Sequence, residues 1–252
     1  MDFAWSLEKA SQFEFVFAAQ RDGAEKLKAA GVLNTLWLPL ACDPVVHRSH
    51  AVEKEFDVCF VGNQFPGPRE DLLKAIQGTF PNVYIGQRYF EDMARTYSAS
   101  RVVFNRSLSS DINMRVFEAL SCGSLLLTNA LEDNGQSELF EGGRHLVTYR
   151  DEAELLERID FYLNHEAERE RIAEQGRAEV LSRHTYLHRM NELIRSVERA
   201  QNAATAASLS EQASACLVSW KRPDNVRLIV QELQSHAAID DIVVWNNNSD
   251  IQ

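Results

Sequence analysis

The sequence has few cysteines, and no two of them form a C-x-x-C pair. Cys42, Cys59, Cys122 and Cys216 are scattered through apolar segments of the 252-residue chain. This pattern favours reduced, buried thiols in a cytosolic protein over a disulfide framework. The chain also lacks an apolar run of the roughly 18 residues that a membrane span needs. Its first residues do not have the basic-then-apolar order of a signal peptide. We therefore expect a cytoplasmic protein with no membrane span.

Positive charge is also in short supply. With 26 Lys and Arg against 37 Asp and Glu, the net charge is −11, which argues against a protein that coats nucleic acid or an anionic membrane. A small phosphate ligand is compatible with this charge, because a helix N-terminus and a few arginines can hold one. No G-x-G-x-x-G, P-loop, G-x-S-x-G or H-E-x-x-H motif occurs. Their absence counts against dehydrogenases, NTPases, hydrolases and zinc proteases.

The stretch DINMRVFEALSCGSLLLTN, residues 111–129, predicts a loop, a helix and then a buried strand. Asp111 and Asn113 are of the types that cap a first helical turn, and Gly123 is typical of a helix end. Glu118 lies among the apolar residues of this helix, and burial of a carboxylate is costly without a partner. We expect a group with hydroxyl or N–H donors to meet Glu118.

Short apolar runs alternate with helical patterns along most of the chain, which predicts a parallel sheet covered on both faces. The expected strands are 13–18, 34–40, 56–62, 82–86, 101–105, 124–128 and 145–149. The expected helices, besides the one that Gly123 ends, are 22–30, 69–77, 90–97, 137–140, 151–164, 166–182 and 186–200. Asp151 would cap the helix 151–164, with Glu154 three residues later completing a capping box. Ligands bind such sheets at the carboxyl ends of the strands. Here these ends lead into the polar loops 62–69, 86–89, 105–113 and 128–136.

The two ends of the sequence predict further pieces of structure. Residues 13–40 form a βαβ-like segment that looks like the end of a domain. Residues 201–212 are small and polar without periodicity, and they predict a linker. A strand at 215–220, a helix at 223–236 and a strand at 241–245 follow. One such unit cannot bury both faces of a sheet, so we expect an incomplete second domain.

Five strings in the right order resemble the C-terminal half of a GT-B glycosyltransferase, and more narrowly the CgeB-like group 1 glycosyltransferases. They are WLPLACDP (37–44), DVCFVGN (57–63), DINMRVFEALSCGSLLLTN (111–129), HLVTYRD (145–151) and HTYLHR (184–189). The resemblance implies an α/β fold. Residues 1–40 would be a remnant of the N-terminal domain with the crossover. Residues 41–200 would be a Rossmann-like nucleotide-sugar-binding domain with C-terminal helices.

The tail resembles the first βαβ unit of a GT-A, family-2-type glycosyltransferase. The matching strings are VSWKRPDN (218–225) and VVWNNNS (243–249). The resemblance implies that residues 213–252 begin a GT-A-like domain, whose metal-binding D-x-D segment would lie further downstream. It implies no cofactor in the GT-B part, where the nucleotide sugar is the substrate, and a divalent metal only in the GT-A part.

The GT-B resemblance assigns roles to residues of one helix. Glu118, in EALSCG, would accept hydrogen bonds from the ribose hydroxyls; alternatively, it is a helix-face charge or a partner of Arg115. Arg115, with the helix N-terminus, would stabilise the charge that develops on the diphosphate; alternatively, it is a surface arginine paired with an acidic neighbour. Many retaining enzymes have an E-x7-E pattern, whose first position here is Ser110. Asp111 would take over that role or simply cap the helix.

Residues on the neighbouring loops complete the implied site. Asn113 would donate to phosphate or start the helix. Gly62, followed by Asn63, would let the backbone approach phosphate or sugar, or would form an ordinary turn. Gly86 and Tyr89 would flank the base, with Tyr89 as a stacking ring or a core or rim aromatic.

Four other residues have weaker claims to a role. Arg69 is a further candidate for phosphate binding. His184 and His188 have a spacing that could bind a metal, but no third ligand is near, so capping and packing are favoured and no metal site is expected. His47 falls in the linker between the two GT-B domains and could reach the cleft, but a structural role is favoured.

The leading hypothesis is an enzyme that transfers a sugar from a nucleotide diphosphate sugar, a UDP-sugar being slightly favoured. The acceptor would be a glycan or another macromolecule, as in polysaccharide biosynthesis. The alternatives are a non-catalytic nucleotide-binding Rossmann-like module and a GT-B-type sugar epimerase. Because most of the acceptor-binding domain is missing from the sequence, we expect the chain to be inactive alone, even if its parent is a hexosyltransferase.

Overall fold

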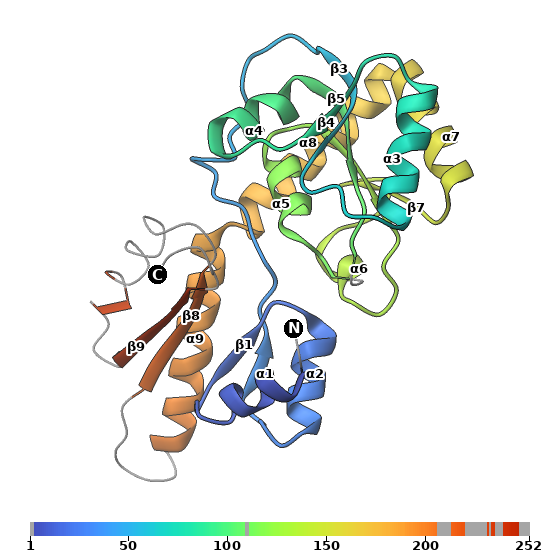
Figure 1. Cartoon of the computed structure of the whole chain (residues 1–252). Coiled ribbons are helices and arrows are strands. Elements are labelled where there is room, and N and C mark those ends of the chain that lie inside the picture. The colour runs from blue at the N-terminus through green and yellow to red at the C-terminus, as the bar shows by residue number, and fades with distance from the viewer. Residues whose placement is uncertain are drawn as a thin grey trace. The chain divides into compact units, whose positions relative to one another are not determined.

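The computed structural model describes residues 3–108, 111–205, 213–219, 231, 233–234 and 239–246. These residues divide into two compact units (Figure 1). Residues 40–188 form one unit, and residues 1–39 together with 189–252 form the other. Each unit is described by itself.

The unit of residues 40–188 is built on a five-stranded parallel sheet with the strand order β4-β3-β5-β6-β7. Its strands are β3 (Phe56–Val61), β4 (Val83–Gly86), β5 (Ser100–Asn105), β6 (Leu125–Asn129) and β7 (Val147–Tyr149). The order reverses after β4, because the chain returns past β3 to form β5 on its other side. Parallel strands with such a reversal are typical of open α/β sheets that bind ligands at their carboxyl ends.

Helices cover both faces of this sheet (Figure 1). They are α3 (Pro68–Thr79), α4 (Phe90–Ser98), α5 (Met114–Ser121), α6 (Gln136–Leu139), α7 (Glu152–Asn164) and α8 (Glu166–Arg183). Helices α3 and α7 pack together on one face, whereas α4 and α5 pack on the other. The predicted alternation of strands and helices in this region is therefore confirmed.

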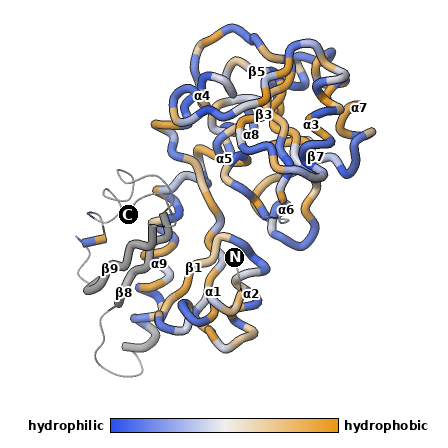
Figure 2. Tube along the Cα trace, in the orientation of Figure 1, coloured by the Kyte–Doolittle hydropathy of each residue, from blue (hydrophilic) through white to orange (hydrophobic). Residues whose placement is uncertain are grey.

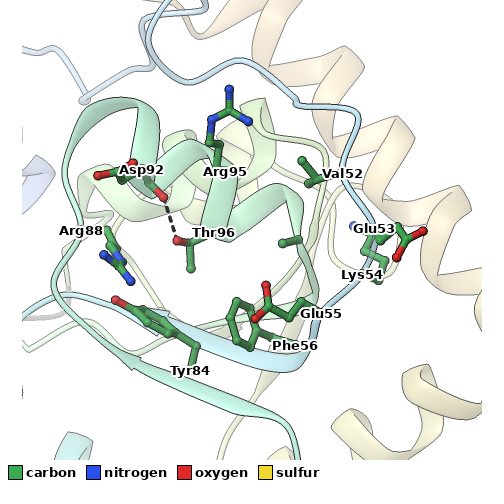
Figure 3. A pocket seen from close by; sticks show the side chains of 11 residues that line it. Val52, Glu53, Lys54, Glu55, Phe56, Tyr84, Arg88, Asp92, Arg95 and Thr96 are labelled. Atoms are coloured by element: carbon green, nitrogen blue, oxygen red, sulfur yellow. Dashed lines mark hydrogen bonds between the residues drawn. The ribbon is translucent and has the colours of Figure 1, made fainter.

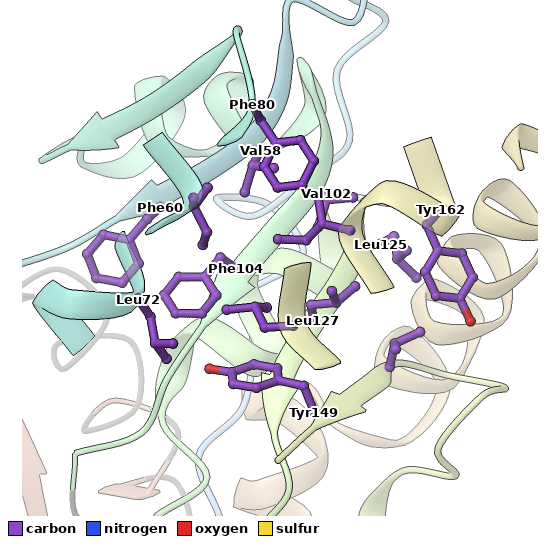
Figure 4. Close-up of a cluster of buried hydrophobic side chains, with 14 of the residues drawn as sticks. Val58, Phe60, Leu72, Phe80, Val102, Phe104, Leu125, Leu127, Tyr149 and Tyr162 are labelled. Atoms are coloured by element: carbon purple, nitrogen blue, oxygen red, sulfur yellow. The ribbon is translucent and has the colours of Figure 1, made fainter. Parts of the chain in front are cut away.

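The main core lies between the sheet and the α3–α7 face (Figure 4). Alternate residues of the central strands point into it, among them Phe60 of β3, Phe104 of β5 and Leu127 of β6. The intervening residues, such as Val103, are equally buried, because the second face is covered as well. Figure 2 shows the resulting hydrophobic colouring along β3 and β5. Strands that are buried on both faces have continuous apolar sequences, and the sequence alone therefore located them.

The ends of two helices follow the predicted chemistry. Gly123, with φ +78°, follows the last turn of α5, a left-handed conformation that glycine adopts without steric cost. The Asp151 carboxylate accepts a hydrogen bond from the Glu154 N–H at 2.9 Å and caps α7. The Glu154 carboxylate accepts in return from the Arg150 N–H at 3.0 Å. The predicted capping box is present, although the return bond goes to the residue before the cap.

Within its described residues, the other unit contains two separate pairs of parallel strands, β1 with β2 and β8 with β9. Its elements are α1 (Phe3–Ala10), β1 (Val16–Ala18), α2 (Arg21–Ala29), β2 (Thr35–Trp37), most of α9 (Tyr186–Thr205), β8 (Ala213–Ser219) and β9 (Ile239–Asn246). A small core forms where Phe15 packs with Leu193 and Val197 of α9.

For the chain ends, the predicted linker is partly wrong, and the prediction for the tail stays largely untested. Helix α9 continues to Thr205, so the first five residues of the predicted linker, 201–205, are helical. Alanine has the highest helix propensity, and the two alanines in this stretch favour continuation. Most of the helix predicted at 223–236 lies outside the described residues, as do residues 220–225 and 247–249 of the two strings.

Candidate functional site

Most of the predicted site residues come together at the carboxyl ends of β3, β4 and β5. Gly62 and Asn63 follow β3, Gly86 ends β4, and Arg115 begins α5 beyond β5. The Gly62 N–H donates to the Gly86 carbonyl at 2.9 Å. Because these strands are parallel, their carboxyl ends lie at one edge of the sheet.

Arg115 is half-buried and lies across two strand ends. Its Nε donates to the Val61 carbonyl at 2.9 Å, and its Nη1 donates to Asn105 Oδ1 at 2.6 Å. The guanidinium lies 4.4 Å from the centre of the Phe60 ring. The alternative of a surface arginine paired with an acidic neighbour is therefore wrong. The two hydrogen bonds fix the position of a cation at the carboxyl edge of the sheet.

Gly62 is glycine because of Arg115. A Cβ at position 62 would collide with Arg115 Nη2 and would lie 3.3 Å from the Phe60 ring. Gly62 also has φ +154°, a backbone conformation that residues with a side chain rarely adopt. The missing Cβ of Gly62 thus makes room for the Arg115 guanidinium. The predicted approach of the Gly62 backbone to a ligand stays a prediction.

Asn105, which sequence reasoning did not single out, joins the parts of the site. It is 1% exposed. Its Oδ1 accepts from Arg115, and its Nδ2 donates to Thr128 Oγ1 at 2.9 Å. Its backbone carbonyl accepts from the Tyr149 hydroxyl at 2.9 Å. The available signal was a polar residue at the end of an apolar strand, since buried polar groups are hydrogen-bonded.

Asn113 is the N-cap residue of α5, but its side chain makes no capping hydrogen bond. Instead, its Nδ2 donates to Asn105 Oδ1 at 3.1 Å. Since an arginine can only donate, the Asn105 atom facing Arg115 is an oxygen, and the Asn113 atom facing that oxygen is therefore the amide nitrogen. The predicted side-chain cap is wrong, because Asn105 holds the Asn113 amide group.

Asp111 also does not cap α5, and the predicted cap is wrong here too. Its carboxylate accepts from the Ser107 hydroxyl at 2.5 Å, and its N–H donates to that same hydroxyl oxygen at 2.9 Å. The Ser107 N–H in turn donates to Asn129 Oδ1 at 2.8 Å. Asp111 is thus held on the loop that follows β5 and is tied to the end of β6.

Glu118 is on α5, one turn after Arg115, and only 7% of it is exposed. Its Oε1 lies 3.6 Å from Nε2 of His47, which is fully buried. The imidazole of His47 is thus a potential donor beside this carboxylate, at a separation slightly longer than a hydrogen bond. Arg115 makes its hydrogen bonds to Val61 and Asn105.

Arg69, predicted as a weaker phosphate ligand, is buried and holds two loops together. Its Nε and Nη2 donate to the Arg106 carbonyl at 3.2 and 2.7 Å, and its Nη1 donates to the Asn63 carbonyl at 3.3 Å. Burial, with the nearby Arg115 charge, lowers the pKa of Arg69 to about 10. These bonds tie the loop after β3 to the loop after β5.

A chain of side chains connects the loops after β3 and β4. Gln87 Nε2 donates to Asn63 Oδ1 at 2.6 Å, and the Tyr89 hydroxyl donates to Gln87 Oε1 at 2.9 Å. Tyr89 is 64% exposed, so its ring is a rim residue available for stacking. A Cβ at Gly86 would lie 2.9 Å from the Tyr84 hydroxyl.

A surface cavity of about 660 Å³ lies elsewhere, between residues 52–56 and α4 (Figure 3). Phe56 and Tyr84 line it, with ring centroids 5.4 Å apart. Arg88 lies over the Tyr84 ring, and Arg95 is paired with Glu91. The cavity is next to the amino end of β3 and contains none of the predicted site residues, so it is separate from the candidate site.

The two histidines with metal-binding spacing have structural roles. His184 packs against Phe117 and Phe140, with ring centroids 6.1 and 5.0 Å away. His188 Nδ1 accepts from the Thr185 N–H at 3.3 Å. Among the described residues, no group of three or more His, Cys, Asp or Glu side chains is placed to hold a metal ion. Within the same residues, none of the helices combines the length and apolar character that a membrane crossing requires.

A protein-family model described as "Glycosyl transferase-like" matches residues 45–195. This match covers more than half of the 252 residues and includes Gly62, Arg115 and Glu118. The chain belongs to this glycosyl transferase-like family. A search of curated proteins found no match to this glycosyl transferase-like chain.

Solved structures share the fold of this glycosyl transferase-like chain. Anabaena Alr3699/HepE, in complex with UDP and glucose, has a TM-score of 0.65 at 16% identity over 78% of this chain and 66% of that one. Sucrose-phosphate synthase from Thermosynechococcus elongatus has a TM-score of 0.59 at 14% identity over 79% and 63%. The pneumococcal O-GlcNAc transferase GtfA, in complex with UDP and GlcNAc, has 0.56 at 12% over 78% and 47%.

These likenesses confirm the predicted GT-B, Rossmann-like fold class. The chain spans just under two thirds of the length of HepE and less than half of GtfA. Identities of this size support a shared fold, and they leave the activity to be argued from the site.

Proposed function

We propose that this glycosyl transferase-like chain binds a nucleotide diphosphate sugar, a UDP-sugar being favoured, for transfer of the sugar to a carbohydrate or macromolecular acceptor. The observation that carries the proposal is the position of Arg115 and Glu118 on one helix, α5. A fixed cation and a nearly buried carboxylate lie one turn apart on α5, the helix that follows the carboxyl end of β5. HepE structures with UDP and with UDP-glucose support the choice of nucleotide.

Arg115 would stabilise the leaving diphosphate. Cleavage of the bond between the sugar and the diphosphate leaves extra negative charge on the phosphate oxygens, and donors already in place stabilise that charge without reorganising. The bonds to Val61 and Asn105 use Nε and Nη1. In the part of the chain that the structure describes, Nη2 is the nitrogen beside Gly62 that remains for a phosphate. The N–H groups of the first turn of α5 add to the same field.

Glu118 would hold the ribose, because an ionised carboxylate accepts from two neighbouring hydroxyls. Glu118 is largely buried, so a hydroxyl bound to it would be shielded from water. Tyr89, exposed on the next loop, would stack on the base. Gly86 and Asn63 would flank the nucleotide, with Arg69 tying the Asn63 loop to the loop after β5. Asn113 and Asp111 would lie nearest the sugar.

Several finer points are part of the same proposal. The parent would be a CgeB-like hexosyltransferase that needs no cofactor in its GT-B part. The chain alone would be inactive, because it spans only about two thirds of HepE. Its tail would begin a GT-A-like domain, the only place for a divalent metal, and the parallel pairing of β8 with β9 supports this. Three buried, free thiols support a cytoplasmic location.

The test is calorimetric titration of the 252-residue chain with UDP, GDP and ADP, followed by titration of Glu118→Gln with the nucleotide that binds. We expect UDP to bind, and Glu118→Gln to weaken binding by about tenfold or more, because a hydrogen bond to a charged group is lost. Glu157→Gln, an exposed glutamate on α7, is the matched control and should bind like the wild type. Absence of binding by all three nucleotides, or equal binding by Glu118→Gln, would overturn the proposal.

A further inference from the structure

His47 is buried against the helix that carries Glu118. Its side chain has no exposed surface, and its Nε2 lies 3.6 Å from Glu118 Oε1. This separation is slightly longer than a hydrogen bond. Functional hydrogen bonds are often long in a free enzyme and shorten when the substrate binds.

The proton on the His47 ring can be located from its neighbours. The Asp43 N–H donates to His47 Nδ1 at 3.0 Å, so Nδ1 carries the lone pair. A neutral imidazole then has its proton on Nε2, which is the nitrogen that faces Glu118. Protonation of Nδ1 as well would place two N–H groups against each other. The local backbone therefore favours a neutral ring that presents an N–H to the carboxylate.

The backbone around His47 is held on both sides. Asp43 Oδ1 accepts from the Val45 N–H at 2.9 Å, and the Asp43 carbonyl accepts from the His47 N–H at 2.7 Å. The Ser121 hydroxyl donates to the His47 carbonyl at 2.6 Å. Residues 118 and 121 are three apart on α5 and share one face. Helix α5 therefore contacts His47 through both the ring and the backbone.

We propose that His47 is a positioning residue for Glu118, and that it sets the direction in which this carboxylate meets the ribose hydroxyls. The inference rests on the proposed function, because it takes Glu118 as the ribose ligand. The His47 N–H, fixed beside Glu118 Oε1, restricts rotation of the carboxylate about the Cγ–Cδ bond of Glu118. A neutral donor does this without cancelling the negative charge, so Glu118 remains a strong acceptor for the two hydroxyls.

The experiment compares the affinity of the chain for UDP and for 2′,3′-dideoxy-UDP by calorimetry. The ratio of the two dissociation constants isolates the ribose hydroxyls. We expect a ratio of about ten or more in the wild type, and a ratio near one in Glu118→Gln. In His47→Ala the ratio should fall several-fold, with little change in the affinity for the dideoxy analogue. His47→Gln, which keeps an N–H donor, should recover part of the ratio.

His184→Ala is the matched control, because His184 is also a buried imidazole of this unit but packs against Phe117 and Phe140. It should lose stability and keep the wild-type ratio. Equal weakening of both ligands in His47→Ala, or an unchanged ratio, would overturn the positioning role while leaving the nucleotide site in place. A wild type that binds neither ligand, or a Glu118→Gln variant with the wild-type ratio, would overturn the proposed function and this inference together.

Discussion

The guanidinium of Arg115 occupies the space that a side chain at position 62 would fill. Gly62 follows β3, and Arg115 is on α5, so the two residues join a strand end to a helix that lies beyond the next strand of the sheet. The approach is possible only because Gly62 has no Cβ. Arg115 is then held by Val61 and Asn105.

Gly62→Ala is expected to lower the free energy of unfolding by about 1–3 kcal/mol, because the new methyl group overpacks the space that Arg115 uses. It should also weaken UDP binding by displacing the guanidinium. Urea unfolding and calorimetry measure the two effects. Gly78→Ala, in α3, is the control: its Cβ meets no atom within 4 Å, so stability should stay the same or rise slightly. If the clash with Arg115 causes the loss of stability, Gly62→Ala should lower the free energy of unfolding by less in an Arg115→Ala background. An equal cost in both backgrounds would contradict it.

Asn105→Ala is expected to lower the free energy of unfolding by at least about 2 kcal/mol, because Arg115, Asn113 and Thr128 lose a hydrogen bond at once. It should also weaken UDP binding, since Arg115 loses the bond from Nη1. Thr128→Val removes one partner of Asn105 and leaves the Arg115 bond in place. It should therefore reduce stability but keep the UDP affinity within about twofold. Equal losses of affinity in the two variants would show that Asn105 does not act through Arg115.

Asp151→Ala is expected to destabilise α7 by about 1 kcal/mol, because the first turn loses its capping carboxylate. For a unit of this size that corresponds to a Tm lower by about 2–4 °C. Asp160→Ala, at an exposed position of the same helix, should change the Tm by less than half as much. Thermal unfolding followed by circular dichroism compares the two. The same shift in both variants would mean that the capping bond adds no stability.

The thiols of Cys42, Cys59 and Cys122 should not react with Ellman's reagent at pH 8 in the folded chain. All three are buried. Burial raises the pKa of Cys59 to about 12 and raises the pKa values of Cys42 and Cys122 as well. At pH 8 the reactive thiolate is then scarce. A Cys216→Ser variant removes the fourth thiol. It should show no fast thiol when folded and three in denaturant; one fast thiol in the folded chain would contradict the burial.

The sequence was sufficient for the elements of the sheet unit, because doubly covered strands have continuous apolar runs and helix ends have local signals such as Gly123 and Asp151. It was also sufficient to place Arg115 and Glu118 on one helix, α5, since the two residues are close in the chain. The site residues themselves remain predictions until a ligand is bound.

The partners of these residues could not be predicted, because they are distant in the sequence. Arg115 bonds to a carbonyl 54 residues away, and no local pattern encodes such a bond. The roles of Asn105 and His47 were hidden for a similar reason, because Asn105 bonds to Thr128, 23 residues away, and His47 to Ser121, 74 residues away. Asn113 shows the opposite error. Its local preference for capping is real, but a bond to Asn105 takes the side chain away from the helix end.

The most direct test of the central claim is a crystal structure of the 252-residue chain with UDP. The account predicts that a phosphate oxygen of UDP lies within hydrogen-bond distance of Arg115 Nη2, and that the ribose hydroxyls lie on the Glu118 carboxylate. UDP bound elsewhere, for example in the cavity beside Phe56 and Tyr84, with Arg115 and Glu118 free of contact, would contradict it.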